Sequence, residues 1–455
     1  MNKDQHSLKG DSLGLVESMV MGVAGTAPAF SIAATTGALL LAVGSHAIAS
    51  LLYCGLIMFG ITLAFFHLNK VNPNAGAAYT WVSDVFHPIL GFFAGWSLLV
   101  AAAVFMVSGT VPAATATLAL ISPDNINDPP TVALVAAGWL ILVSLIVIKG
   151  IKLSSYFQVT LTMLEVGMLA IIIFGVLYQF YSNPIQPFSF SELSVNAFTA
   201  ETFATGALMS LFFFWGWDVT VNLSEETKDS TDNPGKGAVG AMIIVMILFL
   251  SFIVAAQFAL TEQQIEESGT NIIFVLAEKI FPRPWSYMAI IAVMLSTIGT
   301  LETTILQFTR TMFAKGRDKV LNPRYAILHP RWKTPWFSTL VILFFGLLLL
   351  FASAFLPSVN EIIIVSVKAI GFQIAFYYGL TGFACAWHFR HIAIRNFKEF
   401  LFVFCWPALS ACFMVFIAIY SAMTFDLMTD LIGIGGILVG AIPLALNWKT
   451  RGVRK

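Results

Sequence analysis

Runs of about twenty apolar residues recur along almost the entire chain, and this recurrence limits the possible folds more than any other feature. A helix needs roughly 20 mainly apolar residues to cross the hydrocarbon core of a bilayer. The stretches that meet this requirement are 14–42, 46–68, 85–110, 131–149, 155–181, 203–224, 237–260, 285–313, 337–356, 359–386, 399–421 and 427–447. We therefore predict an all-α integral membrane protein with about 12 transmembrane helices in a lipid bilayer.

The composition supports a membrane protein and excludes several other classes. Of the 455 residues, 58% are hydrophobic and 11% are charged, whereas soluble domains carry about 25% charged residues. The formal net charge is zero, so we expect no basic surface and no nucleic-acid partner. The polar N-terminal residues are not followed by an apolar region with a cleavage site, so we expect no removable signal peptide.

Lysine and arginine are distributed unevenly between the two sets of loops. With a cytoplasmic N-terminus, 21 of the 24 basic residues fall inside, and the three exceptions are Lys279 and Arg283 in outer loops and Lys368 within a span. This asymmetry follows the positive-inside rule. It predicts a multi-pass protein of the cell inner (cytoplasmic) membrane with both termini in the cytoplasm.

Two of the stretches, the first and the sixth, contain residues that interrupt a helix. In the first, Gly25 and Pro28 lie in mid-run, and proline removes a backbone donor and clashes with the preceding turn. In the sixth, Gly216 shortly precedes Asp218 within an aromatic run. A charged side chain near the bilayer centre is costly and therefore indicates a functional site. The alternative is an ordinary kink at Pro28 and glycines that allow close helix packing.

The two interruptions are five helices apart, which is the spacing of an inverted-repeat transporter. We predict one domain over residues 1–455, with a first repeat in 1–181, a second in 203–386 and two further helices in 399–447. In such folds the substrate lies near the midplane, between the ends of the half-helices.

Several motifs add a resemblance to a known family. They are Asn72 to Trp81 with Gly91 to Trp96, Gly150-Ile-Lys152, Glu225-Glu226 with Asn233-Pro234, and Arg310 to Asp318 followed by His329 to Pro335. Together they resemble the amino acid–polyamine–organocation (APC) superfamily of permeases. The resemblance implies a 5+5 inverted-repeat fold with broken helices 1 and 6, followed by helices 11 and 12.

The resemblance also implies a substrate site. In the family, backbone amides of helix 1 hold a substrate carboxylate, and here Gly25, Thr26 and Ala27 occupy that region. Pro28 cannot donate a hydrogen bond, so a plain α-amino acid fits less well. Asp218 matches a glutamate of relatives that handle cationic substrates, so we expect it to bind an ammonium group.

Aromatic residues surround this carboxylate in the sequence. We expect Phe212, Trp215 and Gly216 to complete the pocket, since aromatic rings also bind cations by cation–π contact. The five aromatic residues at positions 212–215 and 217 cannot all face one cavity, so the other rings of the run are expected against neighbouring helices or lipid.

Two buried carboxylic acids are candidates for proton coupling. Glu165 lies eleven residues after Ser154, about 16 Å along its helix, where proton-coupled relatives often have a lysine. Glu302 lies eight residues before Arg310, about 12 Å from the inner end. The alternative for each is a structural hydrogen bond, for Glu165 to span 1 or span 8.

Three further charged residues have roles that the sequence leaves open. Lys368 either closes an outer gate, as the resemblance implies for span 10, or forms a static ion pair with Asp218, Glu165 or Glu302. Glu225 and Glu226 are expected at the inner membrane face, paired with basic residues such as Lys152 or Arg310.

The most consistent interpretation is a secondary active transporter of amino acids or related organic amines, proton-coupled and working by alternating access. Its partners are a small-molecule substrate and protons, and no cofactor or metal is expected. The alternatives are a sodium-coupled symporter or an exchanger of the same fold, a non-transporting membrane sensor, or an intramembrane enzyme. The last lacks sequence support, because neither Gly-x-Ser-x-Gly nor His-Glu-x-x-His occurs.

Overall fold

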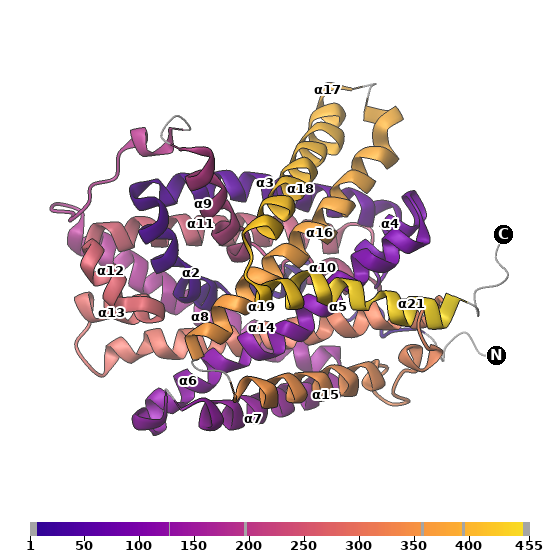
Figure 1. Ribbon diagram of the computed structural model, residues 1–455, viewed down its shortest axis with the longest axis horizontal. Coiled ribbons are helices and arrows are strands. Elements are labelled where there is room, and N and C mark those ends of the chain that lie inside the picture. Colours follow the sequence, from indigo (N-terminus) through magenta and orange to yellow (C-terminus); the bar gives the residue numbers. More distant parts are fainter. Residues whose placement is uncertain (1–6, 127, 195–197, 356–358, 394–395, 449–455) are drawn as a thin grey trace.

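The computed structural model describes residues 7–126, 128–194, 198–355, 359–393 and 396–448. Helices dominate these residues, and one parallel bridge joins Leu13 to Thr227. Figure 1 shows α12 and α13 at one end of the molecule and α4 and α21 toward the other. The basic residues Lys3, Arg395 and those from 449 onward, which the orientation argument used, lie outside the described residues.

The helices of the first half are α1 (Leu15–Gly25), α2 (Pro28–Val43), α3 (Ala47–Val71), α4 (Ala78–Val85), α5 (Pro88–Ser108), α6 (Thr110–Ile121), α7 (Pro129–Ile148), α8 (Ile151–Phe180), α9 (Ala200–Phe213) and α10 (Val219–Asn222). Those of the second half are α11 (Asn233–Ala259), α12 (Glu262–Ser268), α13 (Ile272–Ile280), α14 (Met288–Arg317), α15 (Trp336–Ser353), α16 (Val359–Ala393), α17 (Phe397–Glu399), α18 (Trp406–Thr424), α19 (Leu427–Asp430), α20 (Gly436–Val439) and α21 (Ala441–Trp448).

Among the described residues, ten stretches are long and apolar enough to cross a membrane. The first of these, Leu15–Val71, contains both the α1–α2 pair and α3. The α9–α10 pair is not among the ten, because its interruption leaves α9 with only 14 residues. The first stretch therefore counts as two spans and the α9–α10 pair adds another, which agrees with the prediction of about 12. The all-α fold class is confirmed.

The differences from the sequence prediction lie mostly in the connections. The third span continues through α6 to Ile121, beyond the predicted end at 110. Three short helices, α4, α12 and α13, lie outside the predicted apolar stretches or only touch one of them. They have seven to nine residues, which is too short for a search based on membrane-length apolar runs.

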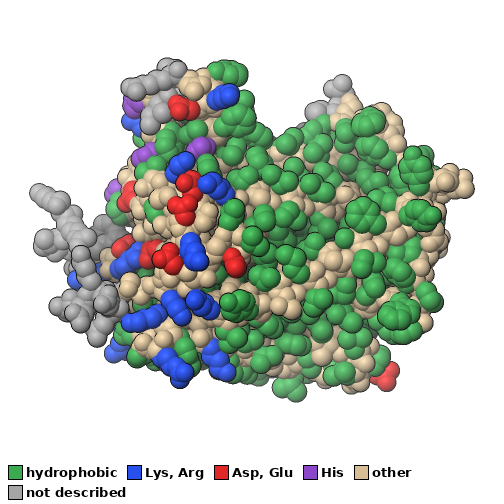
Figure 2. Space-filling model, turned by 180° about the vertical axis from the view of Figure 1, so that it is seen from behind, with side chains coloured by type: hydrophobic (Ala, Val, Ile, Leu, Met, Phe, Trp, Pro, Cys, Tyr) green, Lys and Arg blue, Asp and Glu red, His purple; other side chains and the backbone are tan. Residues whose placement is uncertain are grey.

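The interrupted helices lie at the centre of the bundle, and other helices surround them. α1 packs against α11, α8 and α14, while α2 packs against α9 and α14. Peripheral helices expose apolar side chains, such as Leu134, Phe174 and Phe351. Figure 2 shows hydrophobic side chains covering most of one face, with charged side chains gathered at one end. This distribution is typical of a protein whose sides contact lipid.

Candidate functional site

Both interruptions predicted from the sequence are present. α1 ends at Gly25 and α2 begins at Pro28, which occupies the first helical position. Proline is well suited there, because its missing N–H would have no intrahelical partner. In the sixth segment, α9 ends at Phe213 and α10 begins at Val219.

The two interruptions touch each other at their glycines. A Cβ atom on Gly25 would lie 2.1 Å from the Gly216 carbonyl oxygen, and one on Gly216 would lie 2.0 Å from the Gly25 carbonyl oxygen. Gly216 also has a φ of +103°, which side chains other than glycine rarely adopt. The backbones are therefore in direct contact, and no ligand fits between these two residues.

Replacing Gly216 by alanine is expected to unfold or inactivate the protein. The left-handed backbone adds strain of about 1–2 kcal/mol, and the overpacking adds about 1–3 kcal/mol. Gly138 of α7 provides a matched control, because a Cβ there meets no atom within 4 Å. Thermal unfolding in detergent should show a large loss for G216A and little change for G138A. Equal stability of the two variants would contradict the contact.

The backbone N–H groups of the first interruption already have partners. Those of Thr26 and Ala27 donate to the carbonyls of Val23 and Ala24, at 3.1 Å each. The Thr26 hydroxyl donates to the Val23 carbonyl as well. The residues predicted to hold a substrate carboxylate thus complete the last turn of α1.

Glu165 of α8 lies at the start of α2. Its Oε1 accepts a hydrogen bond from the Ala29 N–H at 2.9 Å, and Ser296 of α14 is a further partner of this carboxyl. The next N–H, of Phe30, donates to the Ser296 hydroxyl at 3.2 Å. A helix N-terminus favours a negative group, which suits a carboxylate at this position. Glu165 of α8 therefore links α2 and α14 at the interruption. Its partners lie in spans 1 and 8, the two spans considered from the sequence.

Asp218 is fully buried and is bound by two tyrosines of α16. Tyr377 and Tyr378 donate their hydroxyls to its two oxygens at 3.0 and 2.9 Å. The Trp215 indole N–H donates to the Tyr377 hydroxyl at 2.9 Å. Neither tyrosine was predicted from the sequence as part of the site. The sequence does contain a signal for them: they are adjacent within an apolar stretch, and a buried tyrosine hydroxyl normally needs a polar partner.

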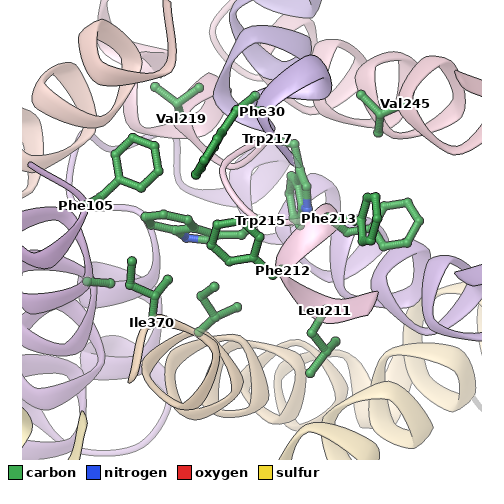
Figure 3. Packing of buried hydrophobic residues seen from close by; sticks show 14 of the residues in the cluster. Phe30, Phe105, Leu211, Phe212, Phe213, Trp215, Trp217, Val219, Val245 and Ile370 are labelled. Atoms are coloured by element: carbon green, nitrogen blue, oxygen red, sulfur yellow. The ribbon is translucent and has the colours of Figure 1, made fainter. Parts of the chain in front are cut away.

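Aromatic rings form a cluster around Trp215, which Figure 3 shows between Phe105 and Phe212, with Phe30 above. Phe30 meets Phe105 and Phe212 edge to face, at centroid distances of 6.3 and 6.1 Å. Trp215 meets Phe105 at 5.5 Å. By contrast, Phe213 and Phe214 pack against α11 through Phe249, so the rings of this run divide between the centre and the neighbouring helices.

A cavity of about 240 Å³ is lined by Phe30. Residues of α2, α6, α13 and α14 line it, and the polar contributions come from Thr115, Thr270 and Asn271. Phe30 lines this cavity and also belongs to the aromatic cluster, so it is in contact with both.

Glu302 belongs to a buried polar contact between α14 and α8. The Ser154 hydroxyl donates to Glu302 Oε1, and the Gln158 amide, oriented to satisfy its neighbours, donates to Oε2 at 2.9 Å. Glu302 has no exposed surface. The two candidate coupling carboxyls therefore lie on the same α8–α14 interface but make separate contacts.

Ion pairs close the opposite end of the molecule. Arg310 and Glu226, both fully buried, form two hydrogen bonds of 2.8 and 2.9 Å. Arg317 and Glu225 pair in the same bidentate way at 2.9 and 3.0 Å. The expectation that the two glutamates pair with basic loop residues such as Arg310 agrees with this geometry.

Lys368 pairs with none of the three carboxylates considered from the sequence. Its Nζ lies 4.0 Å from Asp426, and both side chains are about half exposed. Hydrogen bonds from Thr429, with a smaller contribution from Lys368, hold the pKa of Asp426 below its usual value. Asp426 precedes α19, in a region to which the sequence analysis assigned no chemistry.

An all-α bundle with two interrupted helices in contact, beside a buried carboxylate, has the architecture of a multi-span membrane permease. A family model described as amino acid permease matches residues 13–448. The chain belongs to this family, which confirms the resemblance to the APC superfamily. Permeases are transporters and not enzymes.

Several curated proteins are similar to the chain. It is 22% identical over 323 residues to the methylthioribose transporter of Bacillus subtilis (strain 168), covering 67% of this chain and 66% of that protein. It is 22% identical over 279 residues to the serine/threonine exchanger SteT of the same organism, covering 61% of each. It is 24% identical over 302 residues to the low-affinity putrescine importer PlaP of Escherichia coli (strain K12), covering 62% of this chain and 61% of that protein. The matches thus span less than two thirds of each relative's length.

Proposed function

We propose that the protein is a secondary active transporter of amino acids or related organic amines, driven by protons and working by alternating access. The observation that carries this proposal is Asp218, a fully buried carboxylate beside two interrupted helices that meet at Gly25 and Gly216. The relatives named as transporters of serine and threonine, of putrescine and of methylthioribose support a small polar substrate. The protein resides in the cytoplasmic membrane with both termini inside.

The contrast between the two ends supports alternating access. The paired Arg310 and Glu226 close the basic, cytoplasmic end, whereas the cavity at Phe30 opens toward the other end. Inward opening then requires separation of the ion pairs. The Lys368–Asp426 contact acts in the outer gate, between α16 and the segment before α19.

In this proposal the substrate ammonium binds at Asp218. Phe212 and Trp215 enclose the rest of the molecule, and the backbone of Gly25, Thr26 and Ala27 borders its other end. Glu165 takes up and releases the coupling proton, with Glu302 as the second group. Because Glu165 accepts a hydrogen bond from α2, its protonation weakens that bond and so affects the position of the helix.

Replacing Glu165 by glutamine is expected to abolish the response of uptake to a proton gradient. The amide keeps the size of the carboxyl and still accepts from Ala29, but it carries no titrating proton. Gradient-driven accumulation in liposomes should fall at least tenfold, while exchange of preloaded substrate continues. Glu278→Gln, which changes a surface carboxyl paired with Arg283, should behave like wild type. Full gradient-driven uptake by E165Q would remove Glu165 from the coupling.

The experiment that tests the transport proposal is uptake into liposomes containing the purified protein. A labelled mixture of amino acids and amines is offered with an inward proton gradient and without sodium. Accumulation that a protonophore abolishes is the expected result. Accumulation only with sodium, or only against preloaded substrate, would replace proton coupling by symport with sodium or by exchange. Saturable binding without any flux would identify a sensor.

A further inference from the structure

The hydrogen bonds at the start of α2 limit which substrates can bind there. A free helix N-terminus binds anions through its N–H groups, and in this chain those groups are used internally. Pro28 has no N–H, Ala29 donates to Glu165, and Phe30 donates to Ser296. The fourth, of Ser31, donates to the Ala27 carbonyl at 2.7 Å. A carboxylate of the protein itself thus occupies the position that a substrate carboxylate would need.

The second interruption is no better suited to an anion. Asp218 lies there, and like charges repel each other strongly where water is excluded. Val219 and Thr220, at the start of α10, donate their N–H groups to the carbonyls of Gly216 and Trp217. The second interruption thus presents a buried negative group, which disfavours a substrate carboxylate beside it.

Basic side chains also fail to provide a partner. Among the described residues, the fully buried ones are Arg310 and Lys315, both in the cytoplasmic part of α14. Arg310 is bound to Glu226. The Lys315 ammonium donates to the Phe92 carbonyl and lies 4.2 Å from the centre of the Phe92 ring. The outer cavity, in turn, has no charged residue in its lining.

What the centre does offer suits a positive group. Asp218 provides a charge, two tyrosine hydroxyls orient it, and the ring of Trp215 is linked to it through Tyr377. Aromatic rings attract cations most strongly when water is excluded. The apolar rings of Phe30, Phe105 and Phe212 match a hydrocarbon body.

From this arrangement we infer that the substrate is a cationic amine without a carboxylate group. The inference rests on the proposed transport function and narrows its substrate class. An amine lacks only the carboxylate of the amino acid from which it is formed by decarboxylation, and the protein distinguishes the two compounds by this group. The amino acid brings a negative charge to a site that already contains Asp218 and Glu165.

Matched pairs provide the test: cadaverine with lysine, putrescine with ornithine, and phenethylamine with phenylalanine. Uptake of each labelled compound is measured in liposomes with the purified protein, and empty liposomes correct for passive entry of amines. The expected result is at least tenfold greater accumulation of an amine than of its amino acid. An amino acid that accumulates as well as its amine overturns the inference but leaves transport intact. If no member of any pair accumulates or binds, the proposed function is overturned, and the inference falls with it.

Glu165→Ala tests the physical cause separately. This substitution frees the Ala29 N–H, so the preference for amine over amino acid should decrease by severalfold. The preference is measured as the ratio of binding constants from ligand-induced shifts in melting temperature, because binding needs no proton coupling. Glu278→Ala, on the surface, should leave the ratio unchanged. An unchanged ratio in folded E165A would show that Glu165 does not exclude the carboxylate. If E165A does not fold, the matched pairs in the wild-type protein decide.

Discussion

Substrate accumulation is expected to fall about 100-fold when Asp218 is replaced by asparagine. The amide has nearly the same size, its oxygen can still accept from one of the two tyrosines, and its NH2 group can donate to the hydroxyl oxygen of the other, so the fold should persist. The variant loses the negative charge that the proposed ammonium needs. A charge-assisted hydrogen bond in a buried site is worth about 2–3 kcal/mol, and each 1.4 kcal/mol corresponds to about a factor of ten in affinity. Binding and liposome uptake measure this loss.

Two comparisons show whether the charge or the packing is responsible. Asp84→Asn changes a carboxyl of α4 that accepts from Asn72 and belongs to neither interruption, so this variant should transport normally. Tyr377→Phe retains the charge of Asp218 but removes one of its donors and the partner of Trp215, so a smaller loss is expected, about tenfold. Uptake by D218N at the wild-type rate would rule out Asp218 as the ammonium site.

The sequence predicted the interruptions because their causes are local. Pro28 and Gly216 disturb a helix wherever it lies, and the structure places α2 after the former and a positive φ at the latter. The partners of Asp218 depend instead on which face of α16 turns toward α10. That choice is made by packing between segments about 160 residues apart, and local propensity does not encode it.

The difference between local causes and tertiary packing also decides which partners of the charged residues could be predicted. Glu225 and Glu226 are adjacent at the end of an apolar run, so their location and their basic partners could be predicted. Lys368 was harder, because its partner Asp426 lies in a connection before α19 whose position relative to α16 is a tertiary feature. For Glu165, the partners in spans 1 and 8 could be proposed, but not the fact that its carboxylate occupies the start of α2.

Replacing Arg310 by methionine is expected to destabilise the protein by about 3–5 kcal/mol. The substitution leaves Glu226 buried without the two hydrogen bonds that it accepts, and an unpaired buried charge accounts for losses of this size. Arg317→Met is the matched control, because its pair with Glu225 has the same bidentate geometry but is partly exposed, at 31% and 22%. An exposed pair contributes about 0–1 kcal/mol. Thermal unfolding in detergent compares the two variants.

The double variant R310M/E226Q separates the lost charge balance from the lost packing. It removes both charges, so most of the stability lost in R310M should return. Transport should nevertheless remain impaired, because the contact between α14 and the segment after α10, which in the proposed mechanism closes the cytoplasmic end, is absent. A cysteine placed at the centre should then react with a thiol reagent added from the cytoplasmic side more readily than in the wild-type protein. Equal stability of R310M and R317M would show that burial does not distinguish the two pairs, and unchanged labelling of the double variant would show that the buried pair does not hold this end closed.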